Sequence, residues 1–379
     1  MIELDINLFA GAGGIARGIK WAGFDADLLY ELDSNAWKTL KANKLAACDP
    51  PEWENHKGDV KQVDWRAVKG RVRLLAAGVP CQPFSLAGKH RADEDGRNLF
   101  PELFRAIKDL RPKAVLVENV QGLLRGSFRP YFEYLLRRLE CPSMKPRNEE
   151  LWRQHDKRVR QHQCTPGYEP EYHVVWRLLE AADYGVPQNR RRIFMVATRG
   201  DLPIYRFPEA THSRTALVRS QRSGDYWKSR DLSTTKGRSK KKAPLPDDDG
   251  LEPWITVRDA LDGLPDPAKS EEEAEMNHWI IPGAKSYHGH DGSQLDWPSK
   301  TIKAGVHGVP GGENTLIDED GRFRYYTLRE AARIQSFPNR HVFEGARLQI
   351  TRQIGNAVPP RLAAAVARPL YQLLSNGAR

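Results

Sequence analysis

The start of the chain carries a run of patterns that constrains the fold more than any other stretch. Residues 3–9 alternate toward an apolar strand, residues 11–14 form a glycine turn, and residues 15–21 begin a helix. A strand over 25–30 and a helix over 34–43 follow. Strand, glycine turn, helix and strand in this order open a doubly wound α/β domain, so we predict a Rossmann-like fold.

The glycine turn has the spacing of a nucleotide-binding loop. Its sequence, Gly11-Ala12-Gly13-Gly14-Ile15-Ala16, fits the G-x-G-x-x-G/A pattern. Glycines let the backbone approach a ligand, and an acid at the end of the second strand, here Glu31, takes the ribose hydroxyls. On this stretch alone an NAD-dependent oxidoreductase is a legitimate alternative, although nothing downstream supplies hydride chemistry.

A lone cysteine follows another apolar run. Residues 74–77 predict a short buried strand that leads into Gly78-Val79-Pro80-Cys81-Gln82-Pro83-Phe84-Ser85. The glycine and two prolines force a rigid, non-helical turn. A thiol on a stiff loop just past a strand is placed like a nucleophile. An average cysteine is more often a small buried hydrophobe, but the flanking prolines favour the nucleophile here.

A glutamate ends the next apolar run. Residues 114–117 predict a buried strand that ends at Glu118, at the rim where α/β domains bind ligands. Alone, such a glutamate is better explained as a cap or an ion-pair partner. Together with Cys81 it predicts a nucleophile and acid pair. Between them, polar residues 86–99 predict a mobile loop, and a helix follows over 99–110.

Composition narrows the class of protein. A length of 379 residues suggests two domains, and the net charge of +10 favours an acidic partner such as nucleic acid, although an ordinary basic surface explains the charge almost as well. Four cysteines make no disulfide framework. With no secretory signal pattern and no apolar run near the ~20 residues of a membrane span, we expect a cytoplasmic protein.

The pattern of the chain changes from about residue 207. We predict a small domain over 207–344, polar and basic near 223–246 and glycine-rich near 288–312, and a catalytic domain from 1–206 plus 345–379. We expect the closing helix, about 360–374, to pack back on the first domain.

The charged residues 141–171 look inserted within the catalytic domain. Their Cys141, His155, His162 and Cys164 suggest zinc, but the spacing is not that of a familiar short zinc knuckle. A solvated helical insertion is favoured.

Six stretches, in order along the chain, resemble the motifs of the cytosine-5 DNA methyltransferases. They are Leu8-Phe9-Ala10-Gly11-Ala12-Gly13-Gly14, Pro80-Cys81-Gln82-Pro83-Phe84-Ser85, Glu118-Asn119-Val120, Gln188-Asn189-Arg190-Arg191-Arg192, Arg329-Glu330-Ala331-Ala332-Arg333-Ile334-Gln335-Ser336-Phe337-Pro338 and Gln353-Ile354-Gly355-Asn356-Ala357-Val358-Pro359-Pro360. The match spans the chain outside two insertions, and six motifs in order make coincidence very improbable.

The resemblance implies a Rossmann-like S-adenosylmethionine-dependent methyltransferase domain with a smaller target-recognition domain. It implies methyl transfer to carbon 5 of a cytosine that is flipped out of duplex DNA, through a covalent cysteine adduct. Cys81 would be the nucleophile and Glu118 the proton donor to ring nitrogen 3. Arg192 would contact the base carbonyl, and Arg190 would support the cysteine or the substrate phosphates.

The resemblance also assigns binding residues. Glu31 would hold the ribose of S-adenosylmethionine and Asp59, placed after the presumed third strand, its adenine. The family usually has an aspartate where Asn7 stands, which bears on how the cofactor's amino-acid part is held. The expected cofactor residues are Phe9, Ala10, Gly11, Gly13, Gly14, Glu31, Asp59, Pro80 and Asn356. The expected DNA contacts are Gln82, Ser85, Lys89, Arg91 and Thr301.

The compact length favours a bacterial restriction-modification enzyme that acts on double-stranded DNA as a monomer, without a metal, in the cytoplasm or on the nucleoid. A separate cognate endonuclease is compatible with this class. A tRNA cytosine-5 methyltransferase is the nearest alternative, and the long variable region 207–322 disfavours it. A catalytically silent DNA-binding relative is the other alternative, and the intact Cys81 and Glu118 argue against it.

Overall fold

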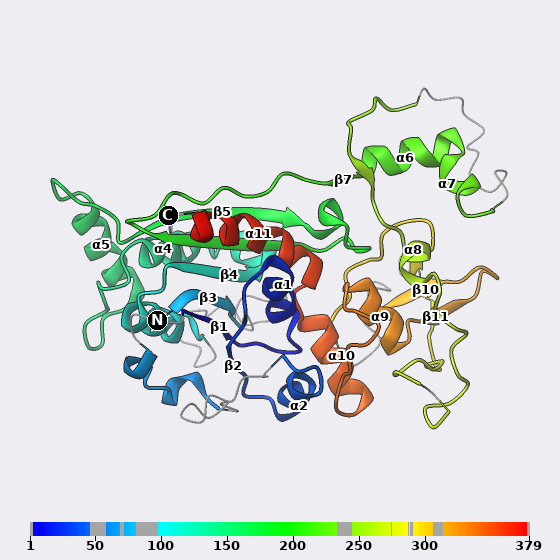
Figure 1. Cartoon of the computed structure of the whole chain (residues 1–379), viewed down its shortest axis with the longest axis horizontal. Helices are drawn as coiled ribbons and strands as arrows, with labels where there is room; N and C mark the ends of the chain where they lie inside the picture. The colour runs from blue at the N-terminus through cyan, green and yellow to red at the C-terminus, as the bar shows by residue number, and fades with distance from the viewer. Residues whose placement is uncertain are drawn as a thin grey trace.

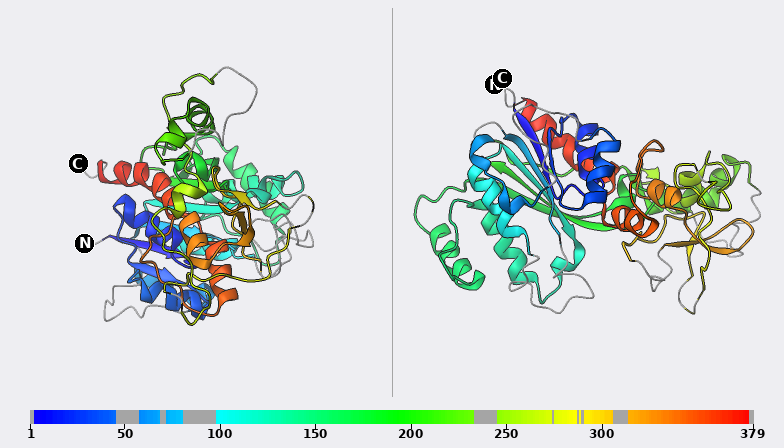
Figure 2. Two further views of the ribbon diagram at one scale, coloured as in Figure 1. Left: turned by 90° about the vertical axis from the view of Figure 1, so that its right-hand side faces the viewer. Right: turned by 90° about the horizontal axis from the view of Figure 1, so that it is seen from below.

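The computed structural model consists of a wide sheet domain and a smaller lobe beside it (Figures 1 and 2). It describes residues 3–45, 58–68, 72–80, 98–232, 245–273, 275–286, 288, 291–305 and 314–376. The helices α9 and α10 lie between the sheet domain and the rest of the smaller lobe (Figure 1).

A six-stranded sheet in the order β2-β1-β3-β4-β6-β5 forms the centre of the large domain. Its strands are β1 Leu4–Leu8, β2 Leu28–Tyr30, β3 Val72–Gly78, β4 Ala114–Val120, β5 Tyr172–Glu180 and β6 Arg191–Arg199. The strands β1 to β4 run parallel, whereas β6 runs antiparallel to both β4 and β5. The connection after β1 leads to β2 on one side and the connection after β3 leads to β4 on the other, so the switch point where open α/β sheets bind ligands lies between β1 and β3.

Helices cover both faces of the sheet, so each apolar strand is buried on two sides. One face carries α1 Gly14–Ala22, α2 Ser34–Ala42 and α11 Pro360–Asn376, and the other carries α3 Phe100–Leu110 and α4 Arg129–Glu140 (Figure 2, right). Short 3-10 turns occupy Val60–Gln62, Trp65–Val68, Gln121–Leu124 and Ala181–Tyr184. The helix α11 packs along α1, as expected for the closing helix.

The charged insertion forms a helix, α5 Trp152–Gln163, that packs against α4. It is less solvated than its composition suggests. His155 is fully buried with Nδ1 2.8 Å from the hydroxyl of Tyr134, and the buried thiol of Cys141 donates to the carbonyl of Arg137. Two of the four candidate zinc ligands therefore serve the packing of this helix.

Short elements build the smaller lobe. They are β7 His212–Ser213, α6 Arg214–Ser223, α7 Asp225–Lys228, β8 Glu252–Pro253, α8 Val257–Leu261, β9 Ser293–Gln294, β10 Thr315–Ile317, β11 Phe323–Tyr325 and α9 Leu328–Ile334. The helix α10 Arg347–Asn356 follows and leads back to the large domain. Within the polar and basic stretch 223–246, residues 225–228 form α7, which buries Tyr226 and Trp227.

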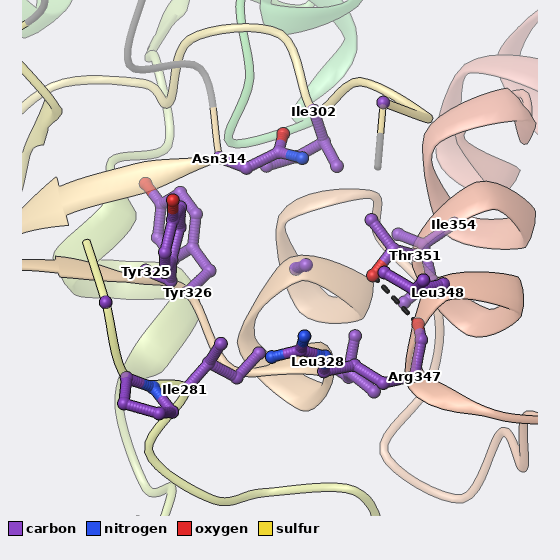
Figure 3. A pocket seen from close by; sticks show the side chains of 14 residues that line it. Ile281, Ile302, Asn314, Tyr325, Tyr326, Leu328, Arg347, Leu348, Thr351 and Ile354 are labelled. Atoms are coloured by element: carbon purple, nitrogen blue, oxygen red, sulfur yellow. Dashed lines mark hydrogen bonds between the residues drawn. The ribbon is translucent and has the colours of Figure 1, made fainter. Parts of the chain in front are cut away.

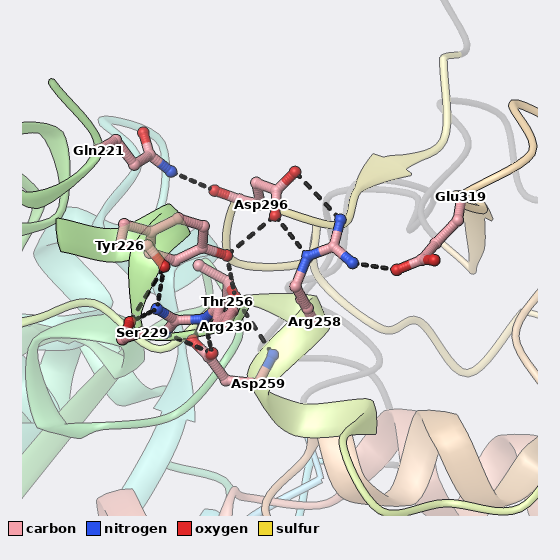
Figure 4. A network of polar contacts seen from close by, with 9 residues as sticks. All are labelled: Gln221, Tyr226, Ser229, Arg230, Thr256, Arg258, Asp259, Asp296 and Glu319. Atoms are coloured by element: carbon pink, nitrogen blue, oxygen red, sulfur yellow. Dashed lines mark hydrogen bonds and ion pairs between the residues drawn. The ribbon is translucent and has the colours of Figure 1, made fainter. Parts of the chain in front are cut away.

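A polar network joins α7 and α8 to the loop after β9 (Figure 4). The Asp296 carboxylate lies 2.6 Å from Nε of Arg258 and accepts the hydroxyl of Tyr226 at 3.0 Å. Arg258 also pairs with Glu319, and Tyr226 reaches Thr256 at 3.0 Å. Few apolar residues are available in this part of the lobe, so side-chain hydrogen bonds fix the relative positions of its short elements.

The core of the smaller lobe continues into the large domain. One apolar cluster contains Ala12 of the glycine loop, Ile302 and Leu328 of the lobe, and Ile354 and Ala357 at the end of α10.

No helix in the described ranges combines the length and apolarity needed to cross a bilayer.

The contact between α1 and α11 generates a stability prediction at Gly18. A Cβ there would collide with Ala363 and come within 2.7 Å of the Pro360 carbonyl oxygen. Overpacking costs about 1–3 kcal/mol, and the roughly 1 kcal/mol gained by alanine in a helix offsets only part of that. We expect Gly18→Ala to lower the Tm by at least about 2 °C in calorimetry. Gly126→Ala, with no atom within 4 Å and no positive φ, is the matched control. Equal melting of both variants would contradict the close packing.

Candidate active site

A cavity of about 450 Å³ opens at the carboxyl ends of β1, β3 and β4. The glycine loop, Glu31, Pro80, Glu118 and Arg192 line it together with one face of α10. A second hollow of about 530 Å³, which reaches Tyr30, Asp59 and Leu99, adjoins it. The two hollows share Phe9, Glu31, Asp33 and Pro80.

The glycine loop lines the cavity in a conformation that requires glycine. Gly11 has φ +54° and Gly13 φ +84°, in the left-handed region that other residues avoid. A Cβ on Gly14 would collide with the carbonyl oxygen of Val358. The expected strand-turn-helix arrangement is therefore confirmed, and the tight turn brings the backbone of residues 10–14 directly to the cavity.

Glu31 braces this loop from the adjacent strand. It follows β2 directly, as expected, and its carboxylate accepts the N–H of Gly11 at 2.7 Å and the N–H of Asp33 at 2.8 Å. Burial raises the pKa of the Glu31 carboxyl, while these two backbone donors lower it. Each carboxylate oxygen has a second lone pair, so Glu31 can brace the loop and still accept a ligand hydroxyl.

Glu118 and Arg192 form an ion pair inside the cavity. Glu118 lies within β4, two residues before its end, and is only 7% exposed. Its Oε1 is 2.9 Å from Nε of Arg192, which stands on β6 opposite Val120. Burial raises the pKa of the Glu118 carboxyl, and the charges of Arg192 and Arg190 oppose that shift. Two neighbouring strands thus hold an acid of raised pKa beside a guanidinium.

Arg190 does not have the place expected of a phosphate contact. It is 1% exposed, and its guanidinium donates to the carbonyls of Ile302 at 2.8 Å, Gly355 at 2.7 Å and Ala357 at 3.0 Å. Burial, and next the charge of Arg192, lower the pKa of this guanidinium. A side chain sealed by three carbonyls cannot reach a substrate phosphate, so that part of the sequence prediction is corrected.

Asp59 also differs from its expected position in the chain. It precedes β3 rather than following the third strand, and it begins the 3-10 turn Val60–Gln62 by accepting the N–H of Lys61 at 3.0 Å. It nevertheless lines the second hollow with Glu31. Asn7 is fully buried in β1 and donates to the carbonyls of Leu8 and Ala76, so its side chain lies inside the sheet rather than in the cavity wall.

The remaining predicted residues divide into three groups. Phe9, Ala10, Gly11, Gly14, Pro80 and Asn356 line the cavity, and Gly13 lies within the loop between them. The hydroxyl of Thr301 donates to the carbonyl of Asn189 at 2.6 Å, so one of its bonds is used within the protein. Cys81, Gln82, Ser85, Lys89 and Arg91 lie outside the described residues; Pro80, which precedes Cys81, lines both hollows.

Sequence reasoning missed the cavity face of α10. Gln349, Arg352 and Gln353 line the cavity together with Asn356, at spacings of three, one and three residues that place them on one side of a helix. The opposite side, with Leu348, Thr351 and Ile354, borders a separate cavity of about 220 Å³ near Tyr325 and Tyr326 (Figure 3). The helical spacing was the available signal, but it does not say which side faces the sheet.

One acidic group could hold a metal ion by geometry alone. Asp5, Asp25 and Asp27 bring a carboxylate oxygen each to within 4.8 Å of one another, the only such group found in the described parts of the chain. Arg73 pairs with Asp5 at 2.5 Å and with Asp25 at 3.2 Å. A guanidinium already balances this cluster, and none of the three acids lines the cavity.

The burial of Arg190 generates a prediction about stability. A lysine offers no fork that could reach three carbonyls at once, so Arg190→Lys leaves buried acceptors without partners. We expect it to lower the free energy of unfolding by about 2–4 kcal/mol in denaturant titrations. Arg191→Lys is the matched control, because the Arg191 side chain is 60% exposed and its pair with Glu180 is a surface one. An equally small effect at both positions would show that the three carbonyl contacts contribute little.

Comparison with known proteins agrees with this geometry. The model of the C-5 cytosine-specific DNA methylase family matches residues 5–141 and 149–372. The type II methyltransferase M.Eco47II of Escherichia coli is 34% identical over 97% of this chain and 79% of its own length. M.NgoMIV of Neisseria gonorrhoeae is 30% identical, and 97% of each chain is covered.

Two solved structures share the fold. A putative DNA modification methyltransferase encoded within an Escherichia coli prophage superposes with a TM-score of 0.56 at 20% identity, over 99% of this chain and 100% of that one. The Entamoeba histolytica methyltransferase EhMeth gives 0.59 at 15% identity, over 100% and 99%.

The comparisons decide between the alternatives that the sequence left open. A tRNA substrate is not favoured, and neither an NAD-dependent oxidoreductase nor a silent relative has support. The chain belongs to the C-5 cytosine-specific DNA methylase family, and its relatives are the methyltransferases of type II restriction-modification systems.

Proposed function

We propose that this chain transfers a methyl group from S-adenosylmethionine to carbon 5 of a cytosine flipped out of duplex DNA, with Cys81 as the nucleophile. One observation carries the proposal. A buried carboxyl of raised pKa, Glu118, lies beside Arg192 in the cavity that also contains the glycine loop, and the residue before Cys81 lines the same cavity.

The chemistry of the two hollows fits S-adenosylmethionine. The left-handed glycines bring backbone close to a ligand, and the carboxylate of Glu31 can accept ribose hydroxyls. Asp59, in the adjoining hollow, is suited to the adenine amino group. When bound, this cofactor supplies a methyl group on a positively charged sulfur. The residues that would hold it are Phe9, Ala10, Gly11, Gly13, Gly14, Glu31, Asp59, Pro80 and Asn356.

Cys81 is needed because carbon 5 of cytosine is a poor nucleophile. Addition of its thiolate to carbon 6 makes the ring enamine-like, so carbon 5 can take the methyl group. A proton on ring nitrogen 3 eases that addition, and burial keeps a proton on Glu118 to higher pH than usual. Loss of the proton from carbon 5 then lets the thiolate leave. Arg192, beside Glu118, is placed to contact the base carbonyl.

Arg190 supports this chemistry without touching the substrate. Its three hydrogen bonds join the residue before β6 to the lobe at Ile302 and to the end of α10 at Gly355 and Ala357. We assign it to positioning of the cavity wall.

Target recognition is proposed for the small domain over 207–344, which has a basic stretch near 236–242 and glycine-rich loops suited to phosphate and groove contacts. Gln82, Ser85, Lys89, Arg91 and Thr301 are the proposed DNA contacts.

The catalytic domain comprises 1–206 plus 345–379. A monomer suffices, since one chain contains both domains, and a cognate endonuclease would act separately. The site of action follows from the substrate and is the DNA of the bacterial cytoplasm.

A mechanism-based trap tests the covalent step. Bisulfite sequencing of DNA from cells that express the protein first identifies the methylated sequence. A duplex with 5-fluorocytosine at that position should then form an adduct that survives denaturing electrophoresis, because fluorine cannot leave carbon 5 as a cation. The adduct should require S-adenosylmethionine and Cys81, and it should form slowly with Glu118→Gln.

The controls separate Cys81 from the other thiols. Cys164→Ser, a change at an exposed cysteine, should trap like the unaltered protein, whereas Cys81→Ser should not trap or methylate. A duplex that is methylated when unfluorinated but gives no stable adduct when fluorinated would rule out covalent catalysis through Cys81.

Exchange of the small domain tests where the target is recognised. Replacing residues 207–325 with the corresponding region of a relative should move methylation to that relative's sequence, because base contacts rather than phosphate contacts specify the site. Bisulfite sequencing gives the result. Methylation that stays at the original sequence would place recognition in the catalytic domain.

A further inference from the structure

His341 contacts the glycine loop although it lines neither hollow. Its Nε2 lies 3.1 Å from the carbonyl oxygen of Ala12, and its Nδ1 lies 3.5 Å from Nη2 of Arg17 in α1. The ring is 1% exposed and packs against both Phe337 and Phe343, with centroids 4.5 and 4.7 Å away, while the two phenyl rings also contact each other at 5.2 Å. The side chain therefore joins the segment after α9 to a loop more than 320 positions earlier in the chain.

These contacts determine which ring nitrogen of His341 carries the hydrogen. A carbonyl oxygen can only accept, so Nε2 carries the hydrogen, and Nδ1 is left as the acceptor for Arg17. Burial, and next the charge of Arg17, lower the pKa of His341 to about 3. The imidazole is thus neutral at working pH, with its single N–H directed at Ala12.

The segment that carries His341 is itself held in place. Val342 exchanges two hydrogen bonds with the side chain of Asn43, at 2.9 and 2.7 Å. The N–H of Glu344 donates to the hydroxyl of Thr39 at 2.9 Å, and that hydroxyl donates to Gln353, a cavity residue, at 2.7 Å. His341 therefore projects from a backbone fixed to both α2 and α10.

We propose that His341 is a positioning residue for the cofactor loop. Its Nε2–H keeps the carbonyl of Ala12 in the conformation that binds S-adenosylmethionine. The inference rests on the proposed function of that loop. Two side chains then hold the loop at neighbouring residues, Glu31 through the N–H of Gly11 and His341 through the carbonyl of Ala12.

The loop needs this support because its own residues do not define its shape. Gly11 and Gly13 can adopt many backbone conformations, and the left-handed one that they have here lets the loop line the cavity. Without the imidazole donor, the buried carbonyl of Ala12 loses its partner and other loop conformers become populated. The apparent Kd for the cofactor then rises in inverse proportion to the fraction of molecules whose loop has the binding conformation.

Substitutions at 341 separate the hydrogen bond from the packing of the ring. His341→Phe keeps an aromatic ring in the cluster with Phe337 and Phe343 but has no donor. His341→Gln places an amide N–H near the position of Nε2, whereas the shorter His341→Asn does not reach it. Isothermal titration of the full-length protein with S-adenosylmethionine gives the Kd, and steady-state methylation gives kcat and KM for the cofactor and for the duplex.

We expect His341→Phe and His341→Asn to raise the Kd and the KM for S-adenosylmethionine about tenfold. We expect kcat at saturating cofactor and the KM for the duplex to stay within about twofold, and His341→Gln to restore the Kd to within about twofold of the unaltered protein. Arg17→Met, which removes the donor to Nδ1 but leaves the ring in place, should give a smaller rise in Kd and provides a second test if a variant at 341 does not fold.

Several results would overturn the proposal. An unchanged Kd in His341→Phe, or a loss in His341→Gln as large as in His341→Asn, would show that the donor has no role. A fall in kcat and a rise in duplex KM equal to the cofactor effect would indicate a general loss of structure. Unaltered protein that does not bind S-adenosylmethionine, or Glu31→Ala that binds it normally, would instead contradict the proposed cofactor site and not the role of His341.

Discussion

The structure depends on the buried guanidinium of Arg190. It binds the carbonyls of Ile302 in the smaller lobe and of Gly355 and Ala357 at the end of α10. Removing a charge from water this completely is costly, and the two terminal nitrogens of the guanidinium offset part of that cost by donating to carbonyl oxygens in fixed positions, whereas Nε has no hydrogen-bond partner. Arg190 immediately precedes β6 and Arg192 lies on it, so the residue that joins the parts of the fold is two positions from the one that pairs with Glu118.

The same physical principle recurs through the site. Side chains bind backbone groups of segments far away in the sequence, as Glu31 does with Gly11, Thr301 with Asn189 and His341 with Ala12. Such bonds gain strength from the low dielectric of a buried setting, and they leave little freedom to the loops that they hold. The cavity is therefore shaped by backbone held at several points, while its charged groups, Glu118 and Arg192, balance each other.

Much of the fold follows from local pattern. The apolar strands of residues 4–8, 72–78 and 114–120, the glycine turn and the closing helix are all visible in the sequence, because period and turn chemistry are local properties. Asp59 was misplaced relative to β3 for a related reason, since the connection from α2 to β3 has no strong period of its own. The charged insertion is less solvated than its composition indicates, because the burial of His155 depends on contact with α4.

The sequence by itself determined the family and the order of the elements, because six short motifs occur together in the family's order. It also predicted the chemical groups, Cys81, Glu118, Arg192 and the glycine loop, since each belongs to one of those motifs. Only the tertiary structure decided which groups meet. Arg190 and Arg192 are two positions apart, so the alternation of a strand alone would put them on the same side, yet Arg190 is enclosed by carbonyls and Arg192 lines the cavity. Arg190 precedes the start of β6, and its place is set by its contacts with Ile302, Gly355 and Ala357. The partners of Arg190 and His341 lie more than a hundred positions away, where no local pattern can indicate them.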